Sequence, residues 1–186
     1  MHLFDKFLNT SGLISIFFVT LTFIFCWKKN NFNLKKHTLS CCGSHNYSKL
    51  FNFSLAVFGI LQILFTYAII KKVLSGTDGW LIIPPIIAGT AMILAAIFDN
   101  KKHFKIHLFS ACVTFITLIL WCFMFHFFIM KNSFYIGIIA LNISVLLSLG
   151  TIITYIKFGK CAVPEIFFIG SVFLWNLFFS YVIILL

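Results

Sequence analysis

The sequence predicts an all-α polytopic membrane protein, a bundle of six transmembrane helices in a single integral membrane domain over residues 1–186. Two observations predict this class. The 186 residues are 61% hydrophobic and only 10% charged, with a mean hydropathy of +1.07, whereas about a quarter of a soluble domain is charged. The apolar residues also form long runs without strand-like alternation, so helices must satisfy the backbone in lipid.

Each apolar run approaches the roughly 20 residues that cross ~30 Å of hydrocarbon. The first lacks a small-residue cleavage site before its lysines, so we expect a retained helix rather than a signal peptide. In the third, Pro84 and Pro85 either begin the helix or follow an irregular stretch from Trp80, because proline is tolerated in a first turn. The expected helices are residues 11–27, 51–70, 80–98, 108–130, 134–156 and 165–186.

Small residues recur at helical spacing in two of these runs. Small side chains let helix backbones approach closely in lipid, where no hydrophobic force drives association. We expect both faces to serve helix packing, with a cofactor groove as the alternative. The residues are Gly137, Ala140, Ser144 and Ser148 in the fifth run, and Ala88, Ala91 and Ala95 in the third.

Strongly polar residues are scarce inside the runs. No Asp, Glu, Lys or Arg falls in the middle of any run, and ion-coupled transporters usually need such groups at depth. A classical coupled transporter is therefore disfavoured. Gln62, Asn142 and Asn176 are the uncharged polar residues expected within the bilayer, and we expect them to hydrogen-bond between helices.

The net charge of +10 comes from 14 basic residues, all lysine. They flank the apolar runs in short groups, as is typical of membrane helices, so no nucleic-acid partner is expected. With six helices, the connections after the first, third and fifth helices share one side. That side carries ten of the lysines, which favours a cytoplasmic location for it. We expect a multi-pass membrane protein.

The same side gathers the candidate chemistry. His103 and His107 are four residues apart, so on a helix they would share one face as paired metal ligands do. Asp99 could join them, and zinc accepts such ligands; the alternative is that both histidines lie at the interface. No cofactor is expected, with zinc on Asp99, His103 and His107 as the candidate exception. No catalytic residue can be assigned. The candidate polar cluster is His37, Ser40, His45, Asp99, His103 and His107, with Cys161 and Glu165 on the same side.

Three segments carry a family resemblance: "HTLSCCG", "FNFSLAVFG" and "FDNKKHFKIHLFSA". The chain resembles domain-of-unknown-function family 998, small bacterial membrane proteins that are distantly similar to the DRAM-type membrane proteins. The resemblance implies a multi-pass protein of the bacterial inner (plasma) membrane with about six helices and no established activity. It also implies a first loop facing away from the cytoplasm, which opposes the lysine count. His37 stands where the family pattern has Asp. The matching positions are Thr38, Leu39, Ser40, Gly43, Asn52, His107 and Ala111.

We therefore expect a non-enzymatic membrane protein whose partners are the lipid bilayer and a lipid or membrane-protein partner. One alternative is a metal-dependent membrane hydrolase acting on lipid at the interface. The His103–His107 spacing, with Asp99 and Ser40, faintly resembles the alkaline-ceramidase-like membrane hydrolases. The other alternative is a small-molecule transporter that works as an oligomer, with a path lined by Gln62, Asn142 or Asn176.

Overall fold

The computed structural model describes residues 3–29, 32–44, 48–74, 79–98 and 102–185. Within these residues the chain is helical and contains no strand, so the all-α prediction is confirmed. Six helices are long and apolar enough to cross a membrane. The elements are α1 (Leu3–Lys29), a 3-10 turn η1 (Leu39–Ser44), α2 (Ser48–Val73), a 3-10 turn η2 (Gly79–Ile82), α3 (Ile83–Ile97), α4 (Phe104–Asn132), α5 (Phe134–Phe158) and α6 (Ala162–Leu185).

Most helices extend beyond the predicted runs. α1 begins at Leu3 rather than near residue 11, and α2 continues to Val73 rather than residue 70. Hydropathy marks only the part within hydrocarbon, whereas helices continue through the polar interface on residues such as lysine. In the third run, the prolines near the helix start and the irregular stretch from Trp80, which we considered as alternatives, both occur. The 3-10 turn η2 comes first, and α3 then begins at Ile83 with proline in its first turn.

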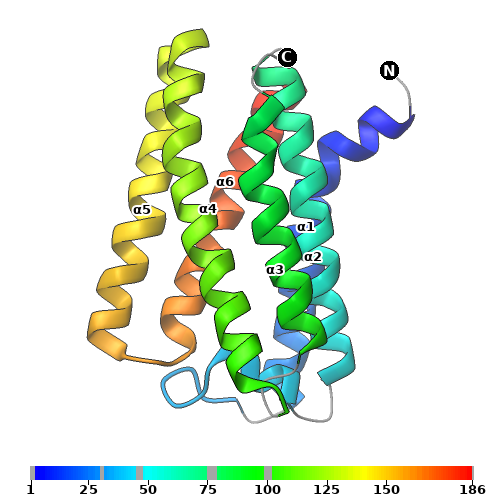
Figure 1. Cartoon of the computed structure of the whole chain (residues 1–186), viewed down its shortest axis with the longest axis vertical. Coiled ribbons are helices and arrows are strands. Elements are labelled where there is room, and N and C mark those ends of the chain that lie inside the picture. The colour runs from blue at the N-terminus through cyan, green and yellow to red at the C-terminus, as the bar shows by residue number, and fades with distance from the viewer. Residues whose placement is uncertain (1–2, 30–31, 45–47, 75–78, 99–101, 186) are drawn as a thin grey trace.

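Successive helices pack against each other, and α6 returns to α1, so the bundle closes on itself (Figure 1). The end of α1 and the start of α2, the end of α3 and the start of α4, and the end of α5 and the start of α6 lie at one end of the bundle, whereas the start of α1 and the end of α6 lie at the other (Figure 1). We call these the loop end and the terminal end. The common location expected for the three lysine-rich connections is confirmed.

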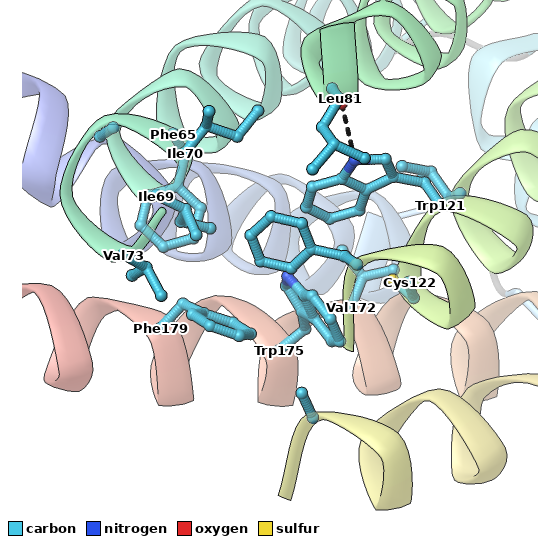
Figure 2. Packing of buried hydrophobic residues seen from close by; sticks show 14 of the residues in the cluster. Phe65, Ile69, Ile70, Val73, Leu81, Trp121, Cys122, Val172, Trp175 and Phe179 are labelled. Carbon is cyan, nitrogen blue, oxygen red and sulfur yellow. Dashed lines mark hydrogen bonds between the residues drawn. The ribbon is translucent and has the colours of Figure 1, made fainter. Parts of the chain in front are cut away.

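Aromatic side chains of α4 and α6 pack together inside the bundle, and we call them the aromatic core (Figure 2). They lie toward the terminal end, since Trp121 is 17 residues into α4 and Phe179 is 17 residues into α6. Trp121 of α4 stacks on Phe125 with ring centroids 4.7 Å apart, and it meets Trp175 of α6 at 5.6 Å. Phe179 lies 4.7 Å from Trp175 and closes the group. The Trp121 indole N–H donates to the Leu81 carbonyl at 2.8 Å, which ties α4 to η2. All four rings are buried.

Glycines permit close backbone approach between neighbouring helices. A Cβ placed at Gly59 of α2 would lie 2.7 Å from the Gly89 carbonyl of α3, and one at Gly89 would lie 2.8 Å from the Gly59 carbonyl. Both distances are shorter than real Cβ contacts, so α2 and α3 cross here backbone to backbone. At Gly137 a Cβ would meet Met130 of α4. The predicted small faces are buried in α5 at Gly137, Ala140, Ser144 and Ser148, and in α3 at Ala88, Ala91 and Ala95.

Two of the three polar residues expected between helices do bond there. Gln62 Nε2 donates to Ser15 Oγ at 2.9 Å, and Asn176 Nδ2 approaches the same atom at 3.4 Å, which joins α1, α2 and α6. The prediction was wrong for Asn142, which is exposed and donates to Ile138 of its own helix. Gln62 and Asn176 border a cavity of about 10 Å³, close to the space of one water. The three side chains therefore do not line a common transport path.

Candidate functional site

A cavity of about 350 Å³ lies in the bundle toward the loop end. Its walls come from α1, α2, α3, α4 and α6, with η1 contributing at the loop end; α5 contributes no lining residue. Small-molecule sites typically measure about 300–1,000 Å³ and are mostly apolar. Apolar side chains dominate these walls, and the phenylalanines among them are Phe23, Phe51, Phe58, Phe115, Phe168 and Phe173.

Small residues line part of the cavity wall, whereas tryptophans occupy the corresponding space between helices in the aromatic core. Ala95, Ala111 and Gly170 all border the space and offer at most one methyl group each. The Phe115 and Phe168 rings, 4.3 Å apart, connect α4 with α6 at its wall. Side chains of this size cannot fill the volume between the helices, so the bundle stays hollow here.

The loop end of the cavity is covered by η1, which the start of α6 holds in place. The Ala162 amide donates to the His37 carbonyl at 2.7 Å and to the Leu34 carbonyl at 3.2 Å. The Leu39 amide donates to Glu165 Oε2 across 126 residues of sequence. Leu39 itself packs in a buried cluster with Ala162 and Cys26. The first loop is therefore part of the bundle and positions side chains at the cavity.

Glu165 is the charged side chain that lines the cavity. Among the described residues, no lysine or histidine nitrogen lies within 4.0 Å of its carboxylate. Lys160, five residues earlier, instead places its ammonium over the Phe104 ring, 4.7 Å from the centroid. The carboxylate gains from the Leu39 N–H and from the N-terminus of α6. Burial among apolar side chains nevertheless disfavours the charge, and the Lys160 ammonium, which forms no ion pair with the carboxylate, acts on it only at longer range.

His107 also lines the cavity, in the first turn of α4. Its Nδ1 lies 2.9 Å from the Ala95 carbonyl and 3.1 Å from the Phe98 carbonyl. Both partners are acceptors, so Nδ1 carries a proton, and in this tautomer Nε2 is the acceptor nitrogen. These contacts hold the start of α4 against the end of α3.

Two buried hydroxyls beside the cavity have no hydrogen-bond partner in the part of the chain that the structure describes. Thr20 Oγ1 of α1 and Ser54 Oγ of α2 both belong to lining residues, and Ser54 is only 2% exposed. Serine and threonine in membrane helices ordinarily bond to a carbonyl of the preceding turn, as Thr22 does to Phe18 and Ser148 does to Ser144. Both oxygen atoms are fully buried, so Thr20 and Ser54 place unpartnered hydroxyls beside the cavity rather than at its surface.

Of the predicted polar cluster, the structure brings Ser40 and His107 to the cavity. His37 is exposed, accepts the Asn33 N–H at Nδ1 (3.1 Å), and packs its ring against Phe32. His103 is exposed, with its ring 5.4 Å from that of Phe98. His45 and Asp99 lie outside the described residues.

The expected stacking of His103 and His107 on one helix does not form. α4 begins at Phe104, and His103 is the residue before it, with a non-helical backbone (φ −131°, ψ 45°). Across the described ranges, no group of three His, Cys, Asp or Glu side chains could hold a metal ion. A zinc site that uses Asp99 or His45 stays a prediction.

Sequence reasoning did not single out Glu165, Thr20 or Ser54 as site residues. Glu165 had a usable signal: it is one of only four acidic residues in the chain and starts an otherwise apolar run. Thr20 and Ser54 carried no signal, since hydroxyls are common within membrane helices and their hydrogen bonding depends on the fold.

These features define the class of the protein as a multi-pass integral membrane protein with an internal cavity between its helices. The chain belongs to the family described as "Protein of unknown function (DUF998)", which matches residues 13–181. The resemblance drawn from its short motifs is thereby confirmed. No curated protein and no solved structure matches the chain. The similarity to DRAM-type proteins stays a prediction.

Proposed function

We propose that this protein is a non-enzymatic, lipid-binding protein of the bacterial plasma membrane, and that its cavity holds one lipid chain. The observation that carries the proposal is the cavity of about 350 Å³, apolar along its walls and polar at one end. The family resemblance supports the bacterial setting. A lipid has the same division, with a polar head at the interface and an apolar chain in the bilayer.

The polar groups are arranged by depth. Glu165 is three residues into α6, so it lies about 5 Å along the helix from its loop-end start. His107 is likewise three residues into α4. Phe58, on the cavity wall, is ten residues into α2 and so about 15 Å deep. A head group at the loop end would therefore place its chain among the phenylalanines.

The cavity reaches the outside of the bundle at Gly170. This residue is exposed and also lines the cavity, and a Cβ added to it would meet nothing within 4 Å. It lies eight residues after the start of α6, about 12 Å along the axis and inside the hydrocarbon zone. The opening therefore faces lipid chains rather than water, which suits a ligand that arrives from the bilayer.

Photo-crosslinking with a phospholipid that carries a diazirine near the end of its chain tests this proposal. In nanodiscs, the lipid should label cavity residues such as Phe58 and Phe173, besides the outer surface. Gly170→Trp should lower cavity labelling several-fold, because the indole would occupy the opening.

Ile153→Trp provides the matched control, since Ile153 is 60% exposed on α5, away from the lining residues. It should leave cavity labelling unchanged. Labelling confined to the outer surface of the wild-type protein would refute the lipid site. Equal cavity labelling in the wild type and Gly170→Trp would refute access at Gly170.

A further inference from the structure

The polar end of the cavity presents hydrogen-bond acceptors to a ligand. The Glu165 carboxylate receives a bond from the Leu39 amide at Oε2, and no hydrogen bond to Oε1 is seen among the described residues. His107 uses its Nδ1–H on the α3 carbonyls, which leaves Nε2 as an acceptor. A ligand that complements this end must supply donors, and a positive charge would compensate the carboxylate.

We infer that the cavity selects a lipid whose head group is a primary ammonium, with Glu165 as its counter-ion. The inference rests on the proposed function, because it specifies the lipid that the cavity holds. A primary ammonium carries three N–H donors and one positive charge. Charge-assisted hydrogen bonds are stronger than neutral ones, and more so away from water. A quaternary ammonium has the charge but no N–H donor.

The deeper polar groups fit the same class of ligand. Ser54 is six residues into α2 and Thr20 nine residues before the end of α1, so they lie about 9 Å and about 14 Å from the loop-end termini of their helices. Both residues line the cavity, and their buried hydroxyls have no partner among the described residues. Rotation of either side chain would bring its hydroxyl to the cavity surface, where it could donate to the ester oxygens of a lipid, which lie farther into the membrane than its head group.

A competing selectivity would come from the lysines. Ten of the 14 lysines belong to the loop side of the sequence, and clustered lysines attract anionic lipids at a membrane surface. That attraction depends on net charge and needs neither Glu165 nor N–H donors. Comparing lipids that share one acyl chain but differ in head group therefore distinguishes selection by Glu165 from selection by the lysines.

Native mass spectrometry of the protein released from phosphatidylcholine nanodiscs makes the comparison. The nanodiscs contain equal amounts of lysophosphatidylethanolamine, lysophosphatidylcholine and lysophosphatidylglycerol with the same acyl chain. We expect lysophosphatidylethanolamine to bind about tenfold more than lysophosphatidylcholine, its equal in net charge. Glu165→Gln should abolish this ratio and still bind all three, because the Gln side-chain oxygen can accept the Leu39 amide.

Asp5→Asn is the matched control, since Asp5 is an acid at the terminal end that pairs with Lys71; it should keep the tenfold ratio. Equal binding of the three lipids to the wild type would overturn the ammonium inference and leave the lipid site intact. Preference for lysophosphatidylglycerol would assign selection to the lysines and also overturn it. Binding of none would overturn the site itself.

Glu165→Asp keeps the charge and should retain part of the preference for lysophosphatidylethanolamine, so it tests the inference if Glu165→Gln does not fold. Complete loss of this preference in Glu165→Asp would contradict the counter-ion role.

Discussion

The two halves of the bundle use the same helices in opposite ways. Toward the terminal end, Trp121, Trp175 and Phe179 fill the space between α4 and α6 (Figure 2). Toward the loop end, a cavity of about 350 Å³ remains between α1, α2, α3, α4 and α6. The difference shows that side-chain size along each helix, rather than helix arrangement alone, decides where a membrane bundle can take a ligand.

The glycines show the same contrast between closely packed and open regions. Gly59 and Gly89 occupy a site where each backbone lies against the other, whereas Gly170 borders open space. The first two glycines permit helix contact, and the third permits access. Variants at matched positions can therefore separate effects on helix packing from effects on ligand access.

The largest effect is expected from Gly59→Leu. A Cβ at this position would lie 2.7 Å from a backbone carbonyl, so α2 and α3 would have to separate. We expect a loss of about 3 kcal/mol in the free energy of unfolding, measured by thermal unfolding in nanodiscs. Gly170→Leu is the control and should leave the unfolding temperature nearly unchanged; an equal loss in both variants would contradict the contrast.

Next in size is the effect of Trp121→Phe compared with Trp175→Phe. Both changes remove part of a buried indole from the aromatic core. Only Trp121 gives up an observed hydrogen bond, to Leu81, because the Trp175 indole N–H has no partner in the described residues. We expect Trp121→Phe to cost about 1 kcal/mol more, since it leaves a buried carbonyl unpaired. Equal losses of stability in the two variants, measured by thermal unfolding, would refute a contribution of the Trp121–Leu81 hydrogen bond.

Filling the cavity should have a smaller effect, of opposite sign. Ala111→Leu adds apolar volume to open space, and we expect a gain of about 0.5–1 kcal/mol in stability together with lower lipid labelling. Ala140→Leu makes the same change at a fully buried residue of α5, and overpacking there should destabilise the fold. Thermal unfolding and crosslinking of both variants test the pair. Stabilisation of both variants, or of neither, would contradict the view that Ala111 borders open space and Ala140 is closely packed.

The helices could be predicted from sequence because the signal is local. Runs of apolar residues near membrane length identify the helices, and an even number of helices places Ser40 and His107 at the same end. Contacts between distant segments carry no such signal. The Leu39–Glu165 hydrogen bond joins residues 126 apart, and nothing in either segment indicates the other.

His103 illustrates a second limit. Its spacing from His107 indicates one shared helical face, but this requires α4 to include both residues. The helix begins one residue later, so the backbone turns away at His103. Helix ends depend on the packing of flanking residues, here the ring contact with Phe98, and hydropathy does not report such contacts.

The smallest effect is expected from Asp5→Asn, which removes the ion pair with Lys71. The two charges lie 3.4 Å apart, and the lysine side chain is 56% exposed. Exposed pairs of this kind contribute about 0.2–1 kcal/mol, and salt screens them. We expect a loss within that range in thermal unfolding, falling further at high salt. Glu165→Gln removes a carboxylate that forms no such ion pair with the described residues, so its effect should fall on lipid selectivity, whereas that of Asp5→Asn should fall on stability alone. A change in lipid selectivity in Asp5→Asn would mean that net charge, rather than the position of Glu165 in the cavity, determines which lipid binds.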